Sequence, residues 1–258
     1  MLQRWKQWRR ERLLQRHALP KALVAEIYSQ LPVLAGLDRD EQERLVELAT
    51  LFLADKRVLG AGGLEPDLGM AVTVALQACL PVLNLDLDWY RGFTTIILYP
   101  GDFVARHRYQ DELGLEHLDE QPMVGEAWDG GPVVLSWEDV ARSGERDGFN
   151  VVIHEFAHKL DMRNGDANGH PPLHEGMDRQ VWTHALSGAY EALCDALDAG
   201  EAPPLDAYAA ESPAEFFSVL SEAFFELPED LAMAYPEVYR QLVLFYRQDP
   251  WQRLQEKR

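Results

Sequence analysis

The stretch Val151-Val-Ile-His154-Glu155-Phe-Ala-His158-Lys-Leu-Asp161 contains the spacing His-Glu-x-x-His. If this stretch is helical, His154 and His158 lie one turn apart on the same face, where two imidazoles can bind one Zn²⁺. Glu155 lies about 100° further round the helix, where it can reach a metal-bound water without being a ligand. The spacing therefore predicts a zinc hydrolase in which Glu155 is the general base.

The sequence around this motif favours a helix. Asn150 is a good N-cap residue, and Gly165 stands at a suitable C-terminal stop. Val152, Phe156 and Leu160 form an apolar stripe on a different face from the histidines. The competing interpretation is a buried helix whose polar face carries two histidines by chance.

A third metal ligand has to come from outside the motif. A catalytic zinc usually has three protein ligands and one open position. The metzincin pattern is absent, because Asp161 and Asn164 stand where that pattern has Gly and His. Nearby candidates sit in or beside a flexible loop, where ligands are harder to hold in place: Asp166, His170, His174 and Glu175.

Glu215 is the stronger candidate, with Glu222 second. The two are seven residues apart and so share one face of a predicted helix. The stretch Ser212-Pro-Ala-Glu215 is also a capping box with Pro at the first helical position, which would explain Glu215 without a metal. From spacing alone both interpretations stay open.

Composition limits the class of protein. The chain has 258 residues, is 47% hydrophobic and 26% charged, and carries a formal net charge of −19. Such a charge disfavours direct nucleic-acid binding, because phosphate would be repelled. No apolar segment follows the basic start as in a secretory signal, and the apolar run 68–87 is a poor membrane span. With only two distant cysteines, these features predict a cytoplasmic protein.

The charge is unevenly distributed. Through Lys21 the chain carries a net charge of +6, so the remainder carries −25. A basic leading segment on an acidic body could contact a partner or a membrane surface. The alternative, which we favour from sequence, is a solvated helix face that packs on the acidic body.

The pattern of elements predicts an α+β protein, mostly helical with a small mixed sheet. We expect one domain over residues 1–258, in which residues 1–60 form a helical extension packed on the rest. Expected helices cover 1–20, 22–31, 38–53 (with a capping start at Asp38), 66–80, 138–143, 151–161, 177–197, 212–226 and one or two within 228–249. Expected strands cover 56–59, 94–99 and 132–137, with 103–109 as a further candidate, and expected loops cover 110–128 and 164–175.

Several stretches together resemble the Mlc titration factor A family of bacterial zinc peptidases. They are His-Glu-Phe-Ala-His-Lys-Leu-Asp (154–161), Asn-Gly-Asp-Ala-Asn-Gly (164–169), Tyr208-Ala-Ala-x-x-Pro-Ala-Glu215-x-Phe, Ser221-Glu222-x-Phe-Phe and Phe245-Tyr-x-Gln-Asp-Pro250. The family is similar in turn to the catalytic domain of anthrax lethal factor. In both, a Tyr stands seven residues before a glutamate ligand, which implies that Glu215 is the third ligand and that Tyr208 is catalytic.

The resemblance implies a zincin-like fold, a cytosolic setting, aminopeptidase activity on small model substrates and binding to the glucose repressor Mlc. Our hypothesis is that His154, His158 and Glu215 hold one Zn²⁺ per chain. Glu155 would then move the proton, and the Tyr208 hydroxyl would stabilise the oxyanion. Alternatively, Tyr208 is a loop residue that packs beside the helix.

Other roles follow from the same hypothesis. Asp161 and Glu222 either orient the imidazoles or are ordinary surface or capping acids. A peptide substrate could add to the strand at 133–137. The alternatives to a peptidase are a non-catalytic regulator that sequesters a transcription factor, and a metal-dependent amidase or esterase.

Overall fold

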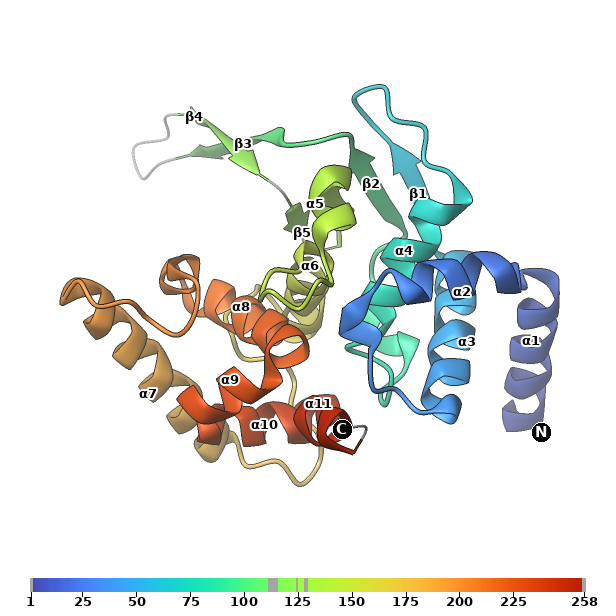
Figure 1. The fold of residues 1–258 in the computed structure, drawn as a ribbon. Helices are drawn as coiled ribbons and strands as arrows, with labels where there is room; N and C mark the ends of the chain where they lie inside the picture. Colours follow the sequence, from blue (N-terminus) through green and yellow to red (C-terminus); the bar gives the residue numbers. More distant parts are fainter. Residues whose placement is uncertain (1, 111–115, 124, 128–129, 257–258) are drawn as a thin grey trace.

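The computed structural model describes residues 2–110, 116–123, 125–127 and 130–256, most of which are helical (Figure 1). The helices are α1 (Leu2–Arg16), α2 (Lys21–Ser29), α3 (Arg39–Asp55), α4 (Leu68–Cys79), α5 (Trp137–Arg142), α6 (Val151–Asp161), α7 (Arg179–Asp198), α8 (Pro213–Glu226), α9 (Pro228–Ala234), α10 (Pro236–Tyr246) and α11 (Pro250–Gln255). Short 3₁₀ turns are η1 (Pro32–Leu34), η2 (Leu87–Tyr90), η3 (Met162–Asn164) and η4 (Ala207–Ala210). Among the described residues, none of the helices combines the length and the apolar character needed to cross a bilayer.

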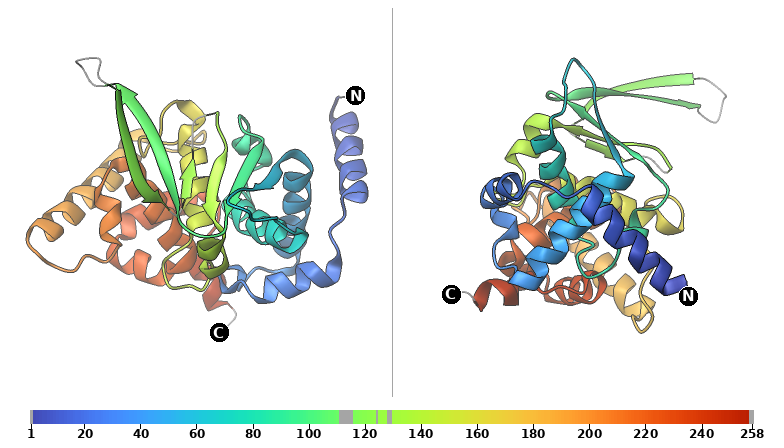
Figure 2. Two further views of the ribbon diagram at one scale, coloured as in Figure 1. Left: turned by 90° about the horizontal axis from the view of Figure 1, so that it is seen from above. Right: turned by 90° about the vertical axis from the view of Figure 1, so that its right-hand side faces the viewer.

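A small mixed sheet lies along one side of these helices. Its strands are β1 (Arg57–Gly60), β2 (Thr95–Tyr99), β6 (Val133–Ser136) and β5 (Gly125–Ala127), in that spatial order. The first three run parallel, and β5 runs antiparallel to β6. A separate antiparallel pair, β3 (Phe103–Gln110) and β4 (Glu116–Met123), projects from the body (Figure 2).

The prediction of a loop over 110–128 is wrong for the described part of that range, which contains β4 and β5. Residues 111–115, 124, 128 and 129 lie outside the described residues. The acidic composition of β4 hid its strand character, because a projecting ribbon does not need one apolar face turned to a core.

The prediction that a substrate pairs with the strand at 133–137 is also wrong. β6 lies inside the sheet, with β2 on one edge and β5 on the other, so both of its edges are occupied. The strand ends at Ser136, whose side chain caps α5 from Trp137 onward. The sheet instead ends at β5, so β5 is its edge strand on this side among the described strands.

Helix α6 lies at the centre of the molecule, against α8, α4 and strands β5 and β6 (Figure 1). Every residue of α6 is buried. Phe156 packs among the rings of Phe52, Tyr90 and Phe93, at centroid distances of 5.6, 4.9 and 5.9 Å. This aromatic cluster fixes the apolar side of α6, so the position of its histidine face is fixed as well.

The N-terminal helices differ in how they join this core. Asp38 and Glu41 form the predicted capping box at the start of α3. Apolar residues of α2 and α3 share the hydrophobic core with α4, α6 and α8. In α1, by contrast, none of the side chains whose burial is described is buried.

Candidate metal centre

The start of α6 is held by side chains. The Asn150 side-chain oxygen accepts a hydrogen bond from the Ile153 backbone N–H at 2.9 Å, which confirms Asn150 as the predicted N-cap. The Ser143 hydroxyl oxygen accepts from the Val151 N–H at 3.1 Å. Two of the N–H groups that a helix start leaves unpaired are therefore satisfied although this end is buried.

The two histidines of α6 face each other. Their Nε2 atoms are 3.2 Å apart, and their ring centroids are 4.9 Å apart. His154 is 9% exposed and His158 is 8% exposed. The helical spacing predicted this convergence, and the structure brings the two rings together as expected.

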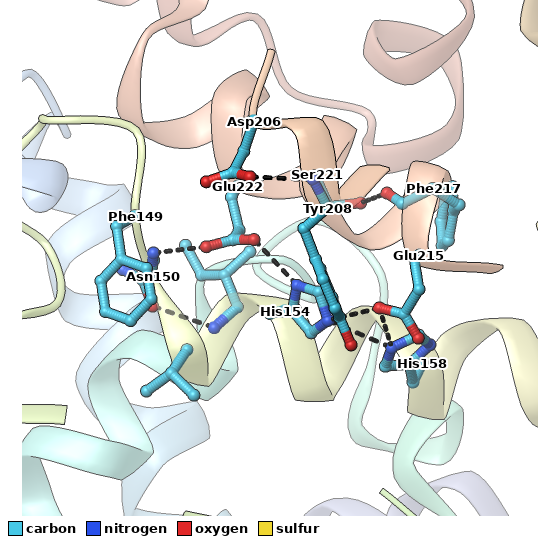
Figure 3. A network of polar contacts seen from close by, with 12 residues as sticks. Phe149, Asn150, His154, His158, Asp206, Tyr208, Glu215, Phe217, Ser221 and Glu222 are labelled. Atoms are coloured by element: carbon cyan, nitrogen blue, oxygen red, sulfur yellow. Dashed lines mark hydrogen bonds and ion pairs between the residues drawn. The ribbon is translucent and has the colours of Figure 1, made fainter. Parts of the chain in front are cut away.

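Glu215 reaches the same point from α8 (Figure 3). Its Oε2 lies 3.0 Å from His154 Nε2 and 3.4 Å from His158 Nε2. The Ser212 hydroxyl accepts from the Glu215 backbone N–H at 3.2 Å, so the helix cap engages the backbone of Glu215. The Glu215 carboxylate is turned to the histidines, so the predicted capping box forms only in its Ser212 half and does not account for the side chain of Glu215.

The other candidate ligands lie elsewhere. Within the described residues, the cluster suited to a metal consists of His154, His158 and Glu215, whose donor atoms all lie within 4.8 Å of one another. His174 Nε2 lies 2.7 Å from the carbonyl oxygen of Phe245, and His170 Nδ1 lies 3.2 Å from the carbonyl oxygen of Asn168.

This donor set fits a zinc ion. Two imidazole nitrogens and one carboxylate oxygen are the ligand types of catalytic zinc sites. His154 Nδ1 is bound to Glu222 at 2.8 Å, so the other ring nitrogen, Nε2, faces the cluster. A carboxylate on the distal nitrogen of a histidine ligand is the usual support for such a ligand.

A second layer of carboxylates ties α8 to the start of α6. Glu222 Oε2 accepts from the Asn150 backbone N–H at 2.5 Å, while its Oε1 faces His154. Glu226, one turn further along α8, accepts from the Asn150 side-chain amide at 2.8 Å and from the Arg146 backbone N–H at 2.6 Å. Glu222 thus binds Asn150 and His154, which lie one helical turn apart. These two contacts fix the orientation of the His154 ring and its position along the axis of α6.

The electrostatics of the cluster favour added positive charge. Burial lowers the pKa of His154, but its hydrogen bonds to Glu215 and Glu222 outweigh this and hold the pKa well above its ordinary value. Burial raises the pKa of Glu215, but His154 and His158 outweigh this and hold that pKa well below its ordinary value. Glu215 is therefore ionised, which is the state in which a carboxylate binds a metal.

Glu155 lies beside the edge strand of the sheet. Its side chain is buried, with the residue 4% exposed. A Cβ atom added at Gly125 of β5 would lie only 2.4 Å from Glu155 Oε1. Glycine at this position is thus required for the carboxylate to lie against the strand.

Tyr208 lies next to the histidines on η4. Its ring centroid is 5.9 Å from that of His154, and its phenol points to the cluster (Figure 3). The residue is 41% exposed. Burial and the carboxylates of Glu215, Glu211 and Glu155 raise the pKa of Tyr208, so its hydroxyl keeps its proton and remains a hydrogen-bond donor.

Asp161 fastens the loop that follows α6. Its Oδ2 accepts from the backbone N–H groups of Asn168 and Gly169, both at 2.6 Å. Gly169 has φ +77° and approaches Pro213 so closely that a Cβ would lie 2.4 Å from the Pro213 carbonyl oxygen. The described hydrogen bonds of Asp161 thus go to this loop, which is tied to the start of α8.

Two residues of this arrangement did not emerge from the sequence. Glu226 had a usable pattern, because Glu215, Glu222 and Glu226 are seven and four residues apart and share a helix face. Gly125 had none, since its requirement comes only from the side chain of a residue thirty positions later on another element.

Comparison with known proteins places the chain in a family. The family model described as glucose-regulated metallo-peptidase M90 matches residues 5–247. Mlc titration factor A of Enterobacter sp. (strain 638) is 45% identical over 231 residues, which cover 88% of this chain and 86% of the relative. The proteins of the same name from Salmonella arizonae and Cronobacter sakazakii are each 43% identical over 226 residues, covering 87% of this chain and 90% and 85% of the relatives. Similarity of this extent shows that the chain belongs to the Mlc titration factor A family of metallopeptidases.

Proposed function

We propose that this protein is a zinc-dependent peptidase of aminopeptidase type, with a zincin-like fold and a cytoplasmic setting. The observation that carries the proposal is the convergence of His154 Nε2, His158 Nε2 and Glu215 Oε2, with Glu155 on the same helix as the histidines. The aminopeptidase preference comes from the family resemblance alone.

In this mechanism His154, His158 and Glu215 would hold one Zn²⁺, which would supply Lewis acidity to acidify water and polarise a carbonyl group. Glu155 accepts the proton of the attacking water and then passes it to the nitrogen of the leaving amine. The Tyr208 hydroxyl donates a hydrogen bond to the oxygen on which negative charge develops.

An extended peptide is the substrate that suits the edge of the sheet. β5 ends the sheet, and its Gly125 lies against the carboxylate of Glu155. A peptide that adds to this edge by main-chain hydrogen bonds would bring a scissile bond beside the proposed base. This replaces the strand at 133–137 as the proposed substrate contact.

The test separates metal binding from proton transfer. We expect Glu155→Gln to retain zinc and to lose about 1,000-fold or more in kcat/KM, because only the base is removed. We expect His154→Ala to lose both zinc and hydrolysis. Metal content by mass spectrometry and hydrolysis of aminoacyl model substrates, with and without chelator, measure the two properties.

The exposed acid Glu237 provides a matched control. Glu237→Gln removes one exposed carboxylate in the first turn of α10, which pairs with Arg240, and should leave both properties unchanged. If Glu155→Gln hydrolyses peptides as fast as the unmodified protein, Glu155 is not the base.

The names of the relatives support a second role, binding of an Mlc-like transcriptional repressor. This role would make the protein a regulator, with or without catalysis. Pull-down of a purified Mlc-like repressor by the Glu155→Gln variant distinguishes the cases. Capture by this inactive variant would show that binding does not need hydrolysis. If neither this variant nor the unmodified protein captures the repressor, the second role is ruled out.

A further inference from the structure

One side of α1 carries tryptophan and arginine together. Trp5 and Trp8 are 56% and 52% exposed. The guanidinium of Arg9 lies 5.8 Å from the centre of the Trp5 ring, and that of Arg12 lies 5.3 Å from the centre of the Trp8 ring. These are i, i+4 pairs, so the four side chains share one side of the helix, which we call the Trp–Arg face.

Few contacts hold α1 to the body. Its described ion pair joins Arg10 to Glu47 of α3 at 2.7 Å, and both side chains are nearly half exposed. A groove of about 940 Å³ lies between α1 and the body formed by α3 and the segment 83–88, and Trp5 and Arg9 are among the α1 residues that line it. A helix of 15 residues with no described buried side chain gains little stability from packing, so an external surface can contact it without disrupting a core.

Charge and position separate α1 from the rest of the molecule. The sequence of α1 has six basic residues and one acidic residue, a net charge of +5, whereas the remainder of the chain carries −24. The one acid of α1, Glu11, lies three residues after Trp8 and so borders the Trp–Arg face, on which the two arginines outnumber it. Figures 1 and 2 show α1 at the margin of the molecule, beside α3 and away from the sheet and the C-terminal helices.

We propose that the Trp–Arg face of α1 is a contact surface for an anionic lipid bilayer. Indole rings favour the headgroup region of a bilayer, and guanidinium groups bind lipid phosphates. Because α1 lies at the margin of the molecule, a flat bilayer can contact it before it reaches the acidic body. Repulsion between the acidic body and the bilayer is screened beyond about 8 Å at physiological salt. The arginines could equally bind the phosphates of a nucleic acid, but the bilayer interface also accommodates the two exposed indoles. The contact is peripheral and independent of the proposed peptidase function.

Vesicle co-sedimentation of the whole protein tests this surface. We expect binding to vesicles made of equal parts of phosphatidylcholine and phosphatidylglycerol, no binding to pure phosphatidylcholine, and release at high salt. Each basic residue near such a surface contributes roughly fivefold in partitioning, so Arg9→Gln with Arg12→Gln should weaken binding about 25-fold. Trp5→Ala with Trp8→Ala should also weaken binding, while the salt dependence remains.

Matched controls change exposed arginines and exposed large apolar residues elsewhere. Arg142→Gln with Arg240→Gln removes two exposed guanidiniums, one of which also lies over an aromatic ring. Met233→Ala with Leu244→Ala removes two exposed apolar side chains of other helices. Both controls should bind vesicles as the unmodified protein does, and peptide hydrolysis should be unchanged in all four variants.

Three outcomes overturn the proposal: no binding to anionic vesicles, equal binding to neutral vesicles, or equal losses in the control and α1 variants. A parallel titration with random-sequence duplex DNA covers the competing partner. If the α1 variants lose DNA binding while vesicle binding is absent, the face serves nucleic acid instead.

Discussion

Helices α6 and α1 show two ways in which a helix of this chain carries charge. Every residue of α6 is buried, and its polar side chains meet partners from α8, from Gly131 just before β6 and from the loop that follows α6. In α1 none of the side chains with described burial is buried, and the arginines among them face solvent or exposed neighbours. Buried hydrogen-bond partners hold the polar side chains of α6 at hydrogen-bonding distance from one another. Solvated charges such as those of α1 do not fix atoms in this way, and they determine only where an oppositely charged surface is attracted.

The difference fits the chemistry proposed for each helix. A metal centre needs its ligands held in place before the ion binds, and the carboxylates of Glu215 and Glu222 do this for His154. A peripheral contact needs exposure and net charge, which the sequence of α1 provides. The first prediction contrasts α6 with α1, and the others concern the buried residues around α6.

Truncating one aromatic residue on each helix gives the largest contrast. Phe156→Ala should lower the free energy of unfolding by about 3–5 kcal/mol, because it empties the centre of an aromatic cluster. Trp8→Ala should change it by less than about 0.5 kcal/mol, since Trp8 is 52% exposed. Urea unfolding measures both, and similar losses would show that α1 is packed as tightly as α6.

The carboxyl of Glu226, which joins α8 to the start of α6, should make the free energy of unfolding depend on pH. Burial raises the pKa of Glu226 from its ordinary value of 4.5 to about 7, with smaller contributions from Asp147 and Glu222 and opposing hydrogen bonds from Asn150 and Arg146. Between these values the folded protein keeps a proton that the unfolded chain has lost. The free energy of unfolding should therefore fall by roughly 3 kcal/mol as pH rises through this window.

The variant Glu226→Gln lacks this titration. Its free energy of unfolding, measured in urea at a series of pH values, should rise relative to that of the unmodified protein by roughly 3 kcal/mol across the window. Glu237→Gln, an exposed change, should give a flat difference. A flat difference for Glu226→Gln would mean that this carboxyl titrates normally.

Gly125→Ala should displace the proposed base without unfolding the protein. The new methyl group would overlap Glu155, so the carboxylate has to move. We expect about 100-fold lower kcat/KM, with zinc content and melting temperature nearly unchanged. Gly188→Ala is the control, since a Cβ at Gly188 meets nothing within 4 Å. Full activity in Gly125→Ala would place the productive position of Glu155 away from β5.

Glu222→Gln should weaken metal binding. The amide keeps the shape of the carboxylate but not its charge beside His154 Nδ1, and such changes typically cost 10- to 100-fold in affinity. Competition with a chelating dye measures the affinity, and Glu191→Gln on α7 is a control outside the network. Unchanged zinc affinity would limit Glu222 to holding the N–H of Asn150.

Local rules were sufficient where the chain interacts with itself nearby. The spacing of His154 and His158, the N-cap Asn150, the capping box at Asp38 and the Ser212 cap all depend on residues within four positions, and the structure has each of them. The same rules missed β4 and chose β6, which is an inner strand, for the substrate contact, because pairing partners depend on distant segments.

The sequence by itself determined that two imidazoles share one helix face beside a carboxylate, since a helix repeats every 3.6 residues. Resemblance to a family singled out Glu215, but the spacing alone left its two interpretations open. Only the tertiary structure decided which groups surround the cluster: Glu215 and Glu222 arrive on α8, Glu226 holds the start of α6, and Gly125 makes room for Glu155. These contacts join segments 30 to 76 residues apart, and their geometry follows from how the helices and the sheet pack on one core.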